Sequence, residues 1–153
     1  MGDSLTHEDS RQMTTETIYG QIVAKANNYL AVPDGNGARR IIKSDIVRAY
    51  ERTFASQCTI YCGVGISTPF RLYAFIWQKS KQYDLDNSIK TLLDCLQSVG
   101  AITDDNLCME IVARKGIDRV NPRVEFALEE INKQLSLFDL RELYLQARGM
   151  NDK

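Results

Sequence analysis

Histidine and long apolar runs are almost missing from this sequence of 153 residues. A helix needs roughly 18 apolar residues to span a bilayer, and no stretch of this chain approaches that length. Residues 1–15 are polar and of mixed charge, unlike a secretory signal. These absences predict a cytoplasmic protein that does not enter a membrane.

Zinc ligands are also too sparse for a complete structural site. The four cysteines are Cys58, Cys62, Cys95 and Cys108, and the one histidine is His7 near the N-terminus. The spacing of Cys58 and Cys62 suits half of a zinc site, but structural zinc needs four nitrogen or sulfur ligands. We therefore expect buried free thiols in a reducing compartment.

Glycine does not form a phosphate-binding loop. Such a loop needs glycines at a recognised spacing where a helix opens. Residues 33–37, Pro-Asp-Gly-Asn-Gly, instead suit a tight turn, because Gly and Asn adopt positive φ angles at low cost. The composition is otherwise ordinary: 44% apolar and 25% charged residues are typical of a globular domain.

Positive charge is concentrated in the first half of the chain, although the net charge is −1. Between Gly20 and Lys81 the sequence has nine basic residues and three acidic ones, and acidic residues become frequent from Asp84 onward. Such a chain can bind a polyanion if a bound cation reverses the sign of the acidic cluster; the alternative is two ordinary solvated faces. The candidates for gripping a DNA backbone are Arg39, Arg40, Lys43, Arg48 and Arg52.

Apolar periodicity and turn residues predict both helices and strands. Two helices have a clear apolar stripe, formed by Ile46, Val47, Tyr50 and Phe54 in the first and by Ile89, Leu92, Leu93 and Leu96 in the second. Ser44 suits the N-cap of the first helix and Asp86 that of the second, which Gly100 ends. In chain order we predict a strand over 18–32 that ends near residues 27–28, a short strand over 39–43, a helix over 44–57, one or two strands over 59–77, a helix over 86–98, strands over 107–114 and 123–128, and a helix over 140–148.

The most informative feature is a concentration of carboxylates after residue 83. Asp84-Leu85-Asp86-Asn87 is followed by Lys90, Asp94 and the pair Asp104-Asp105. Like charges held close together repel unless a cation lies between them. Mg²⁺ prefers oxygen ligands and often keeps one or two carboxylates plus substrate phosphates. The pattern indicates metal-dependent phosphodiester chemistry, and a plain acidic surface patch is the alternative.

The local geometry of these acids supports a site. In an extended segment Asp84 and Asp86 point to the same side, about 7 Å apart at Cα. They would then lie where a strand ends and a helix begins, a place that suits phosphates. A neighbouring strand would bring Asp105 beside them, and three acids would hold one or two Mg²⁺ ions. Lys90, one turn into the helix, would reach the scissile phosphate.

Other motifs with paired acids fit less well. An EF-hand loop that starts at Asp84 needs Gly at its sixth position and Glu at its twelfth, where this chain has Ile89 and Cys95. A nucleotidyltransferase usually has a Gly-Ser pair shortly before its acids, and none precedes them here. A helix cap explains Asp86 but leaves the other acids without a role.

The spacing of Asp84-Leu85-Asp86-Asn87, Lys90, Asp94 and Asp104-Asp105 resembles the signature of the RusA family of Holliday-junction resolvases. The similarity covers roughly residues 18–130 and is strong around the acids. The resemblance implies a two-layer α+β fold, in which a mixed β-sheet packs against helices, and a homodimer. It also implies Mg²⁺-dependent paired cleavage of branched DNA in recombination and repair, with Mn²⁺ as a substitute ion.

The resemblance further implies roles for individual residues. It makes Asp84, Asp86 and Asp105 the metal ligands and Lys90 a catalytic helper. The chain would then divide into a flexible leader (residues 1–16), an endonuclease domain (17–131) and a C-terminal tail (132–153). Asp94 and Asp104 match the motif without a defined role; Asp94 would pair with Lys90.

A second motif lies in the tail. The segment Gln134-Leu135-Ser136-Leu137-Phe138 resembles the peptide by which many bacterial replication and repair proteins bind the sliding clamp. Gln134 offers an amide, and Leu137 and Phe138 suit an apolar pocket, with Leu135 between them. The alternative is that these apolar residues pack into the domain's own core.

Three functions are compatible with the sequence. The first is a junction resolvase with the residues named above. The second is a clamp-tethered DNA-binding module without catalysis, and the third is a nuclease of other branched DNA, such as flaps. A cleavage assay on four-way junctions with and without Mg²⁺ separates them.

Overall fold

The computed structural model describes residues 13–24, 29–131 and 137–147. These residues form an α+β fold, as predicted. The strands are β1 (Glu16–Tyr19), β2 (Tyr29–Pro33), β3 (Arg39–Lys43), β4 (Phe70–Gln78), β5 (Cys108–Ile117) and β6 (Arg123–Glu130). The helices are α1 (Asp45–Gln57), α2 (Leu85–Ser98) and α3 (Leu137–Ala147), and a short 3-10 helix, Asp105–Leu107, precedes β5.

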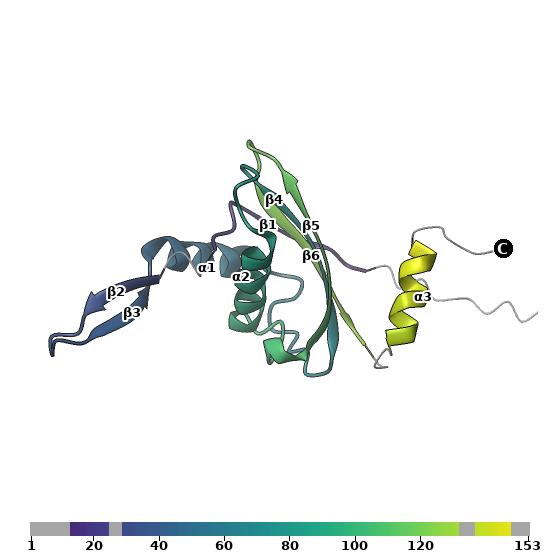
Figure 1. Ribbon diagram of the computed structural model, residues 1–153, viewed down its shortest axis with the longest axis horizontal. Coiled ribbons are helices and arrows are strands. Elements are labelled where there is room, and N and C mark those ends of the chain that lie inside the picture. Colours follow the sequence, from purple (N-terminus) through teal and green to yellow (C-terminus); the bar gives the residue numbers. More distant parts are fainter. Residues whose placement is uncertain (1–12, 25–28, 132–136, 148–153) are drawn as a thin grey trace, which may run out of the picture.

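One mixed sheet organises the domain, with the strand order β1-β6-β4-β5. β6 is antiparallel to β1 and β4, whereas β4 and β5 are parallel. Parallel neighbours need a crossover rather than a tight turn, and α2 supplies it. In the sequence α2 lies between β4 and β5. In Figure 1 it lies on one side of the sheet. This β4–α2–β5 unit positions the acidic motif.

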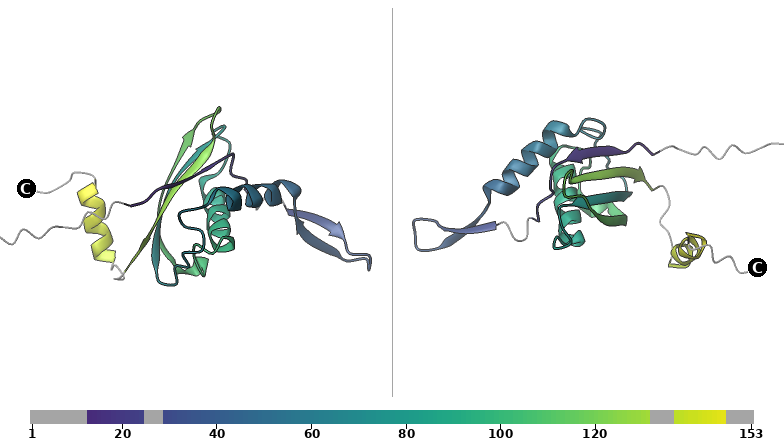
Figure 2. Two further views of the ribbon diagram at one scale, coloured as in Figure 1. Left: turned by 180° about the vertical axis from the view of Figure 1, so that it is seen from behind. Right: turned by 90° about the horizontal axis from the view of Figure 1, so that it is seen from above.

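Helices α1 and α2 cover one face of the sheet (Figures 1 and 2). Along β4 buried side chains alternate strictly with half-buried ones, as expected for a strand with one face against helices. The predicted stripe of α1 is confirmed at Val47, Tyr50 and Phe54, but Ile46 is 59% exposed. In α2 the stripe is confirmed, with Leu93 partly buried; its buried apolar members are Ile89, Leu92, Cys95 and Leu96.

Strands β2 and β3 form a separate two-stranded sheet. Their connection is the predicted turn, in which Asp34 Oδ1 accepts the N–H of Asn36 at 2.8 Å and Gly35 and Gly37 both have φ +84°. The predicted return strand is confirmed as β3. In Figures 1 and 2 this hairpin projects away from the large sheet.

The predicted single strand over 18–32 is wrong. β1 ends at Tyr19, and β2 begins only at Tyr29. Gly20 has φ +113°, and its N–H bonds the carbonyl of Pro122, so the chain turns out of the β1 direction at this glycine. Asn27 and Asn28 lie outside the described residues.

The predicted strand region 59–77 is only partly correct, because β4 begins at Phe70. The N–H groups of Thr59, Ile60 and Tyr61 bond the carboxylate of Glu16 instead of another strand. Gly63 (φ +75°) and Gly65 (φ +67°) then follow, and these positive φ angles bend the chain before β4.

Several boundaries also differ. Asp84, not Asp86, is the N-cap of α2, because its carbonyl already accepts the N–H of Ser88 at 3.2 Å. β5 extends to Ile117 because residues 115–117 continue the pairing with β4. Glu16, which we assigned to the leader, belongs to β1 and is 3% exposed. α3 begins at Leu137 rather than Leu140.

Candidate active site

The acidic motif lies at the carboxyl end of β4, where the chain passes into α2. Asp84 is the N-cap residue of α2, and Asp86 is in its first turn. The first backbone N–H groups of a helix have no partner within it, and the helix dipole is positive at this end. This position therefore favours negatively charged groups, including phosphates.

Asp84, Asp86 and Lys90 line one hollow between α2 and β5. Its volume is about 640 Å³. Asp86 and Lys90 are four residues apart on the helix, which places both on the same face. The remaining lining residues are apolar except for Lys115; they are Leu85, Ile89, Leu93, Ile111, Ala113 and Lys115. The structure thus brings together two predicted acids and the predicted lysine.

The carboxylate of Asp84 is not used to cap the helix. Its backbone carbonyl accepts the Ser88 hydroxyl at 2.8 Å, and Gln78 Nε2 donates to that hydroxyl at 2.8 Å. Asn87 Nδ2 donates to Asp84 Oδ2 at 3.3 Å. This chain of bonds from the end of β4 holds the start of α2 in place beside the hollow that Asp84 lines. Sequence reasoning missed Gln78 and Ser88 because neither type is distinctive.

Lys115 is another residue that the motif did not reveal. Its Nζ donates to the carbonyls of Lys81 at 3.1 Å and Tyr83 at 2.9 Å. These bonds tie the segment before Asp84 to the end of β5. Because its partners are backbone carbonyls, no side-chain pattern in the sequence marks this lysine.

Asp105 does not join Asp84 and Asp86 within one chain. It begins the 3-10 helix, and its N–H bonds Gln97 Oε1, in the last turn of α2, at 3.3 Å. α2 has 14 residues, so its two ends are about 20 Å apart. Because β5 runs parallel to β4, Asp105 lies at the end of the unit opposite the hollow. The expectation that the strand after α2 would bring Asp105 beside the other acids is wrong for a single chain.

The other acids of the motif have local roles or other contacts. Asp104 is the N-cap of the 3-10 helix and accepts the N–H of Asn106 at 2.9 Å. Asp94 is half-buried on α2. Over the part of the chain that the structure describes, no three acidic, histidine or cysteine side chains group as a metal site.

The donor set at the hollow nevertheless suits Mg²⁺. Asp84 and Asp86 supply carboxylate oxygens at an exposed position, and Mg²⁺ is often held by one or two carboxylates together with substrate phosphates. Lys90, on the same rim, offers a cation to a phosphate oxygen. Within one chain, the hollow contains two of the three metal ligands that the family resemblance implies.

The candidate DNA-binding residues lie on β3 and α1. Arg39, Arg40, Arg48 and Arg52 are exposed. Lys43 is half-buried and pairs with Glu51 at 2.9 Å. Four of the five thus present exposed surface to a polyanion, and the two arginines on β3 stand on the projecting hairpin.

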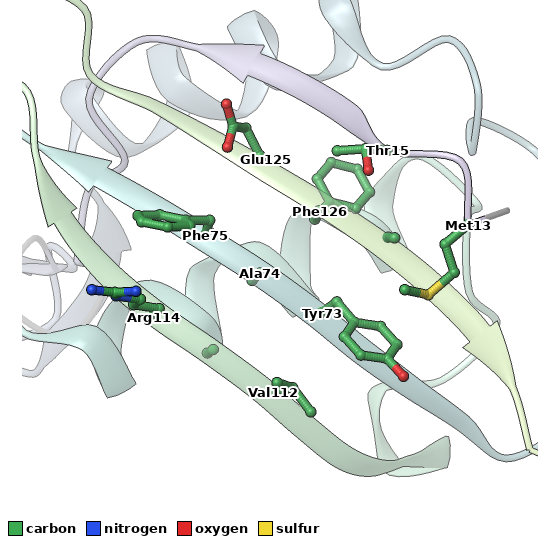
Figure 3. Close-up of a pocket in the computed structure, with 11 residues that line it drawn as sticks. Met13, Thr15, Tyr73, Ala74, Phe75, Val112, Arg114, Glu125 and Phe126 are labelled. Carbon is green, nitrogen blue, oxygen red and sulfur yellow. The ribbon is translucent and has the colours of Figure 1, made fainter. Parts of the chain in front are cut away.

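The face of the sheet opposite the helices has a different character. Figure 3 shows Tyr73, Phe75, Val112 and Arg114 around a shallow hollow on this face. Phe75 stacks on Trp77 with ring centroids 4.2 Å apart, and Arg71 forms ion pairs with Glu110 and Glu129. Its guanidinium bonds to Glu110 raise the pKa of Arg71. These balanced charges do not favour a polyanion, so this hollow is not part of the candidate site.

Two further predictions concern cysteine and the tail. All four cysteines are free thiols; Cys58 and Cys95 are buried, but Cys62 is exposed and Cys108 half-buried. Burial raises the pKa of Cys58 to about 12, so this thiol is not a reactive group. In the tail motif Leu137 and Phe138 are 85% and 67% exposed, whereas residues 134–136 lie outside the described residues.

Comparison with known protein families identifies the family of this chain. No helix in the described ranges has the length and apolar character needed to cross a membrane. No curated protein matches the chain. Residues 19–129, most of the sequence, match the family described as endodeoxyribonuclease RusA. The chain therefore belongs to the RusA endodeoxyribonuclease family and is a nuclease of the Holliday-junction resolvase type.

Proposed function

We propose that this protein is a Mg²⁺-dependent endonuclease that resolves four-way DNA junctions as a homodimer. One observation carries the proposal: Asp84, Asp86 and Lys90 share a hollow at the N-terminus of α2, in a chain of a nuclease family. A bound Mg²⁺ polarises the phosphodiester and lowers the pKa of the attacking water.

The residues of the hollow have distinct roles in this proposal. Asp84 and Asp86 hold the ion, and Lys90 bonds the phosphate oxygen on which negative charge develops. The helix N-terminus favours the same charge. Lys115 acts indirectly: its two hydrogen bonds to the carbonyls of Lys81 and Tyr83 position the segment before Asp84.

The third ligand, Asp105, comes from the second copy in the dimer. A single chain separates it from the hollow by the length of α2, and a two-fold axis is the simplest way to bring the two together. Each dimer then has two composite sites, which suits two symmetric cuts in a four-way junction. The same need for two cuts is the reason to propose a homodimer.

Asp86→Asn tests the metal-ligand assignment. Because the Lewis acid contributes several kcal/mol to the barrier, we expect junction cleavage to fall by a factor on the order of 10³, while junction binding survives. The measurement is cleavage of a labelled four-way junction in Mg²⁺, with a flap substrate in parallel and binding measured in Ca²⁺. Cutting at the wild-type rate would remove Asp86 from the mechanism, and faster cutting of flaps than of junctions would make the protein a nuclease of other branched DNA.

Mixing two inactive variants tests the composite site. Asp105→Asn and the double variant Asp84→Asn, Asp86→Asn are co-expressed, so that one of the two sites in the mixed dimer keeps every acid. We expect each variant alone to leave junctions intact and the mixed dimer to nick one strand. The control mixes Asp105→Asn with the variant that carries all three substitutions, which restores no site. A mixed dimer that never nicks would show that each chain builds its own site.

A further inference from the structure

We propose that Ile41, on the β2–β3 hairpin, inserts between unstacked bases at the branch point of a four-way junction. The inference rests on the proposed function, because it names a residue by which the same nuclease distinguishes branched DNA from continuous duplex. Ile41, in the middle of β3, is 73% exposed. One exposed isoleucine is ordinary in itself, and it is its place on a projecting basic hairpin that carries the inference.

The hairpin leaves Ile41 without cover. In the register of the two strands Ala31 lies opposite Ile41, and Ala31 is small and also exposed. In Figures 1 and 2 the hairpin projects away from the large sheet, and among the described strands β2 and β3 pair only with each other. An isolated two-stranded hairpin is at best marginally stable in water, so this element gains stability from a partner that covers it.

The charges around Ile41 indicate what that partner is. Side chains alternate along a strand, so Arg39 lies on the same face as Ile41 and Arg40 on the other, and both arginines are exposed. The acid of the turn, Asp34, bonds backbone N–H groups within that turn. A second copy of the hairpin would bring like charges together, whereas a DNA backbone neutralises them. Proteins that distort DNA insert apolar side chains such as isoleucine between base steps, with basic side chains nearby.

A branch point is where such an insertion costs least. In a continuous duplex the inserted side chain must first unstack two neighbouring base pairs, which opposes binding. Stacking is already interrupted where the four arms of an open junction meet, so little of this cost remains there. The same side chain therefore favours binding to a junction over binding to a duplex of the same sequence.

The hairpin leaves the domain beside the candidate active site. Ile46, in the first turn of α1, lines a second hollow together with Tyr83 and Asp84. Ile41 is five residues before Ile46, a separation of at most about 17 Å along an extended chain. Bases in one strand stack about 3.4 Å apart, so this span covers about five nucleotides. The bases that Ile41 contacts would thus lie within a few nucleotides of the scissile phosphate.

Ile41→Ser tests the insertion. A fluorescent adenine analogue, whose emission rises when it leaves the base stack, is placed at the branch point. Binding to this junction and to a duplex of the same sequence is titrated in Ca²⁺, so that neither is cut. We expect Ile41→Ser to lose the rise in emission and to lower the ratio of junction affinity to duplex affinity roughly tenfold, an effect that the burial of one isoleucine side chain can supply.

Two variants control for the hairpin fold and for apolar surface in general. Ile41→Leu keeps a large apolar side chain at the same position and should behave as the wild type does. Val120→Ser removes an apolar side chain that is 94% exposed on the loop between β5 and β6, and it should also leave the emission rise and the affinity ratio unchanged.

The possible results separate the inference from the proposed function. A wild-type emission rise and affinity ratio in Ile41→Ser overturns the inference, as does an equal loss in Ile41→Leu or Val120→Ser. If Ile41→Ser instead converts a dimer to a monomer in gel filtration, Ile41 contacts a second copy and the inference is wrong. If the wild type cuts junctions in Mg²⁺ while Ile41→Ser binds as the wild type does, the proposed function stands without the insertion. If the wild type unstacks the branch point but never cuts it, the insertion stands and the proposed catalysis is wrong.

Discussion

At the scale of single residues, the buried carboxylate of Glu16 stabilises the fold, in contrast to the exposed acids of the hollow. It accepts N–H bonds from Thr59, Ile60 and Tyr61 and a thiol bond from Cys58. Burial opposes its charge, but these donors outweigh the burial and lower the pKa of Glu16 below its ordinary value of 4.5. The chain uses this acid to hold the loop that leads to β4, not for catalysis.

Glu16→Gln should therefore destabilise the fold in a pH-dependent way. The folded pKa is depressed, so the ionised carboxylate stabilises the protein above pH 4.5, and this contribution is lost as the pH falls from 4.5 through the folded pKa. We expect a loss of about 2 kcal/mol in the free energy of unfolding at pH 7, and a smaller difference from wild type at pH 3. Urea unfolding at both pH values measures it.

Glu130→Gln is the control for that experiment, because Glu130 is exposed and bonds one hydroxyl, Thr68 Oγ1, at 2.8 Å. It should change the unfolding free energy little at either pH. If Glu16→Gln lowers the free energy of unfolding equally at pH 3 and pH 7, the negative charge of Glu16 does not stabilise the loop.

At the scale of elements, the β2–β3 hairpin is the part best placed to grip DNA outside the catalytic hollow. It stands apart from the large sheet (Figure 1), and Arg39 and Arg40 are exposed on it. Contacts to the phosphate backbone are independent of sequence and weaken with salt, because each releases condensed counterions. The Lys43–Glu51 pair joins the base of the hairpin to α1.

The variant Arg39→Ala, Arg40→Ala should weaken junction binding to a similar degree for different junction sequences. The slope of log K against log salt should become shallower by roughly 2, one unit for each arginine that no longer binds a phosphate. A salt titration of binding, in Ca²⁺ to prevent cleavage, gives this slope. Arg119→Ala, at an exposed residue on the loop between β5 and β6, should leave the slope as it is. An unchanged slope in the double variant would remove the hairpin from the DNA interface.

At the scale of the whole molecule, the tail carries apolar side chains that the domain does not cover. Large apolar side chains of α3 are exposed; among those that the structure describes they are Leu137, Phe138, Leu140 and Tyr144. We propose that the first two anchor the Gln134–Phe138 segment in a pocket of the bacterial sliding clamp, which would tether the nuclease to replicating or repaired DNA. An anchor residue of this kind often accounts for roughly 2 kcal/mol or more of a binding energy.

Phe138→Ala should therefore weaken clamp binding at least about tenfold, while junction cleavage without the clamp stays at the wild-type rate. Tyr144→Ala is the matched control, because it removes a similarly exposed ring from the same helix outside the motif. Binding of both variants to immobilised clamp provides the comparison. Equal losses in the two variants would mean that the helix, rather than the motif, makes the contact, and a loss of cleavage would make the segment structural.

Local patterns predicted much of this molecule because they depend on neighbours in the chain. The α1 stripe, the turn at residues 34–37 and the grouping of Asp84, Asp86 and Lys90 all arise within a few residues, where helix and turn geometry set the spacing. The strand over 18–32 failed because Gly20 and its bond to the distant Pro122 redirect the chain.

The amino-acid sequence alone was enough to determine the fold class, the nuclease motif and the grouping of Asp84, Asp86 and Lys90. These features depend on periodicity and on residues about one helical turn apart. The placement of Asp105 depended on the direction of β5 relative to β4, since parallel pairing puts the two ends of α2 at opposite ends of the unit. The positioning residues Gln78, Ser88 and Lys115 likewise became visible only in three dimensions, because their bonds run between elements or to backbone carbonyls.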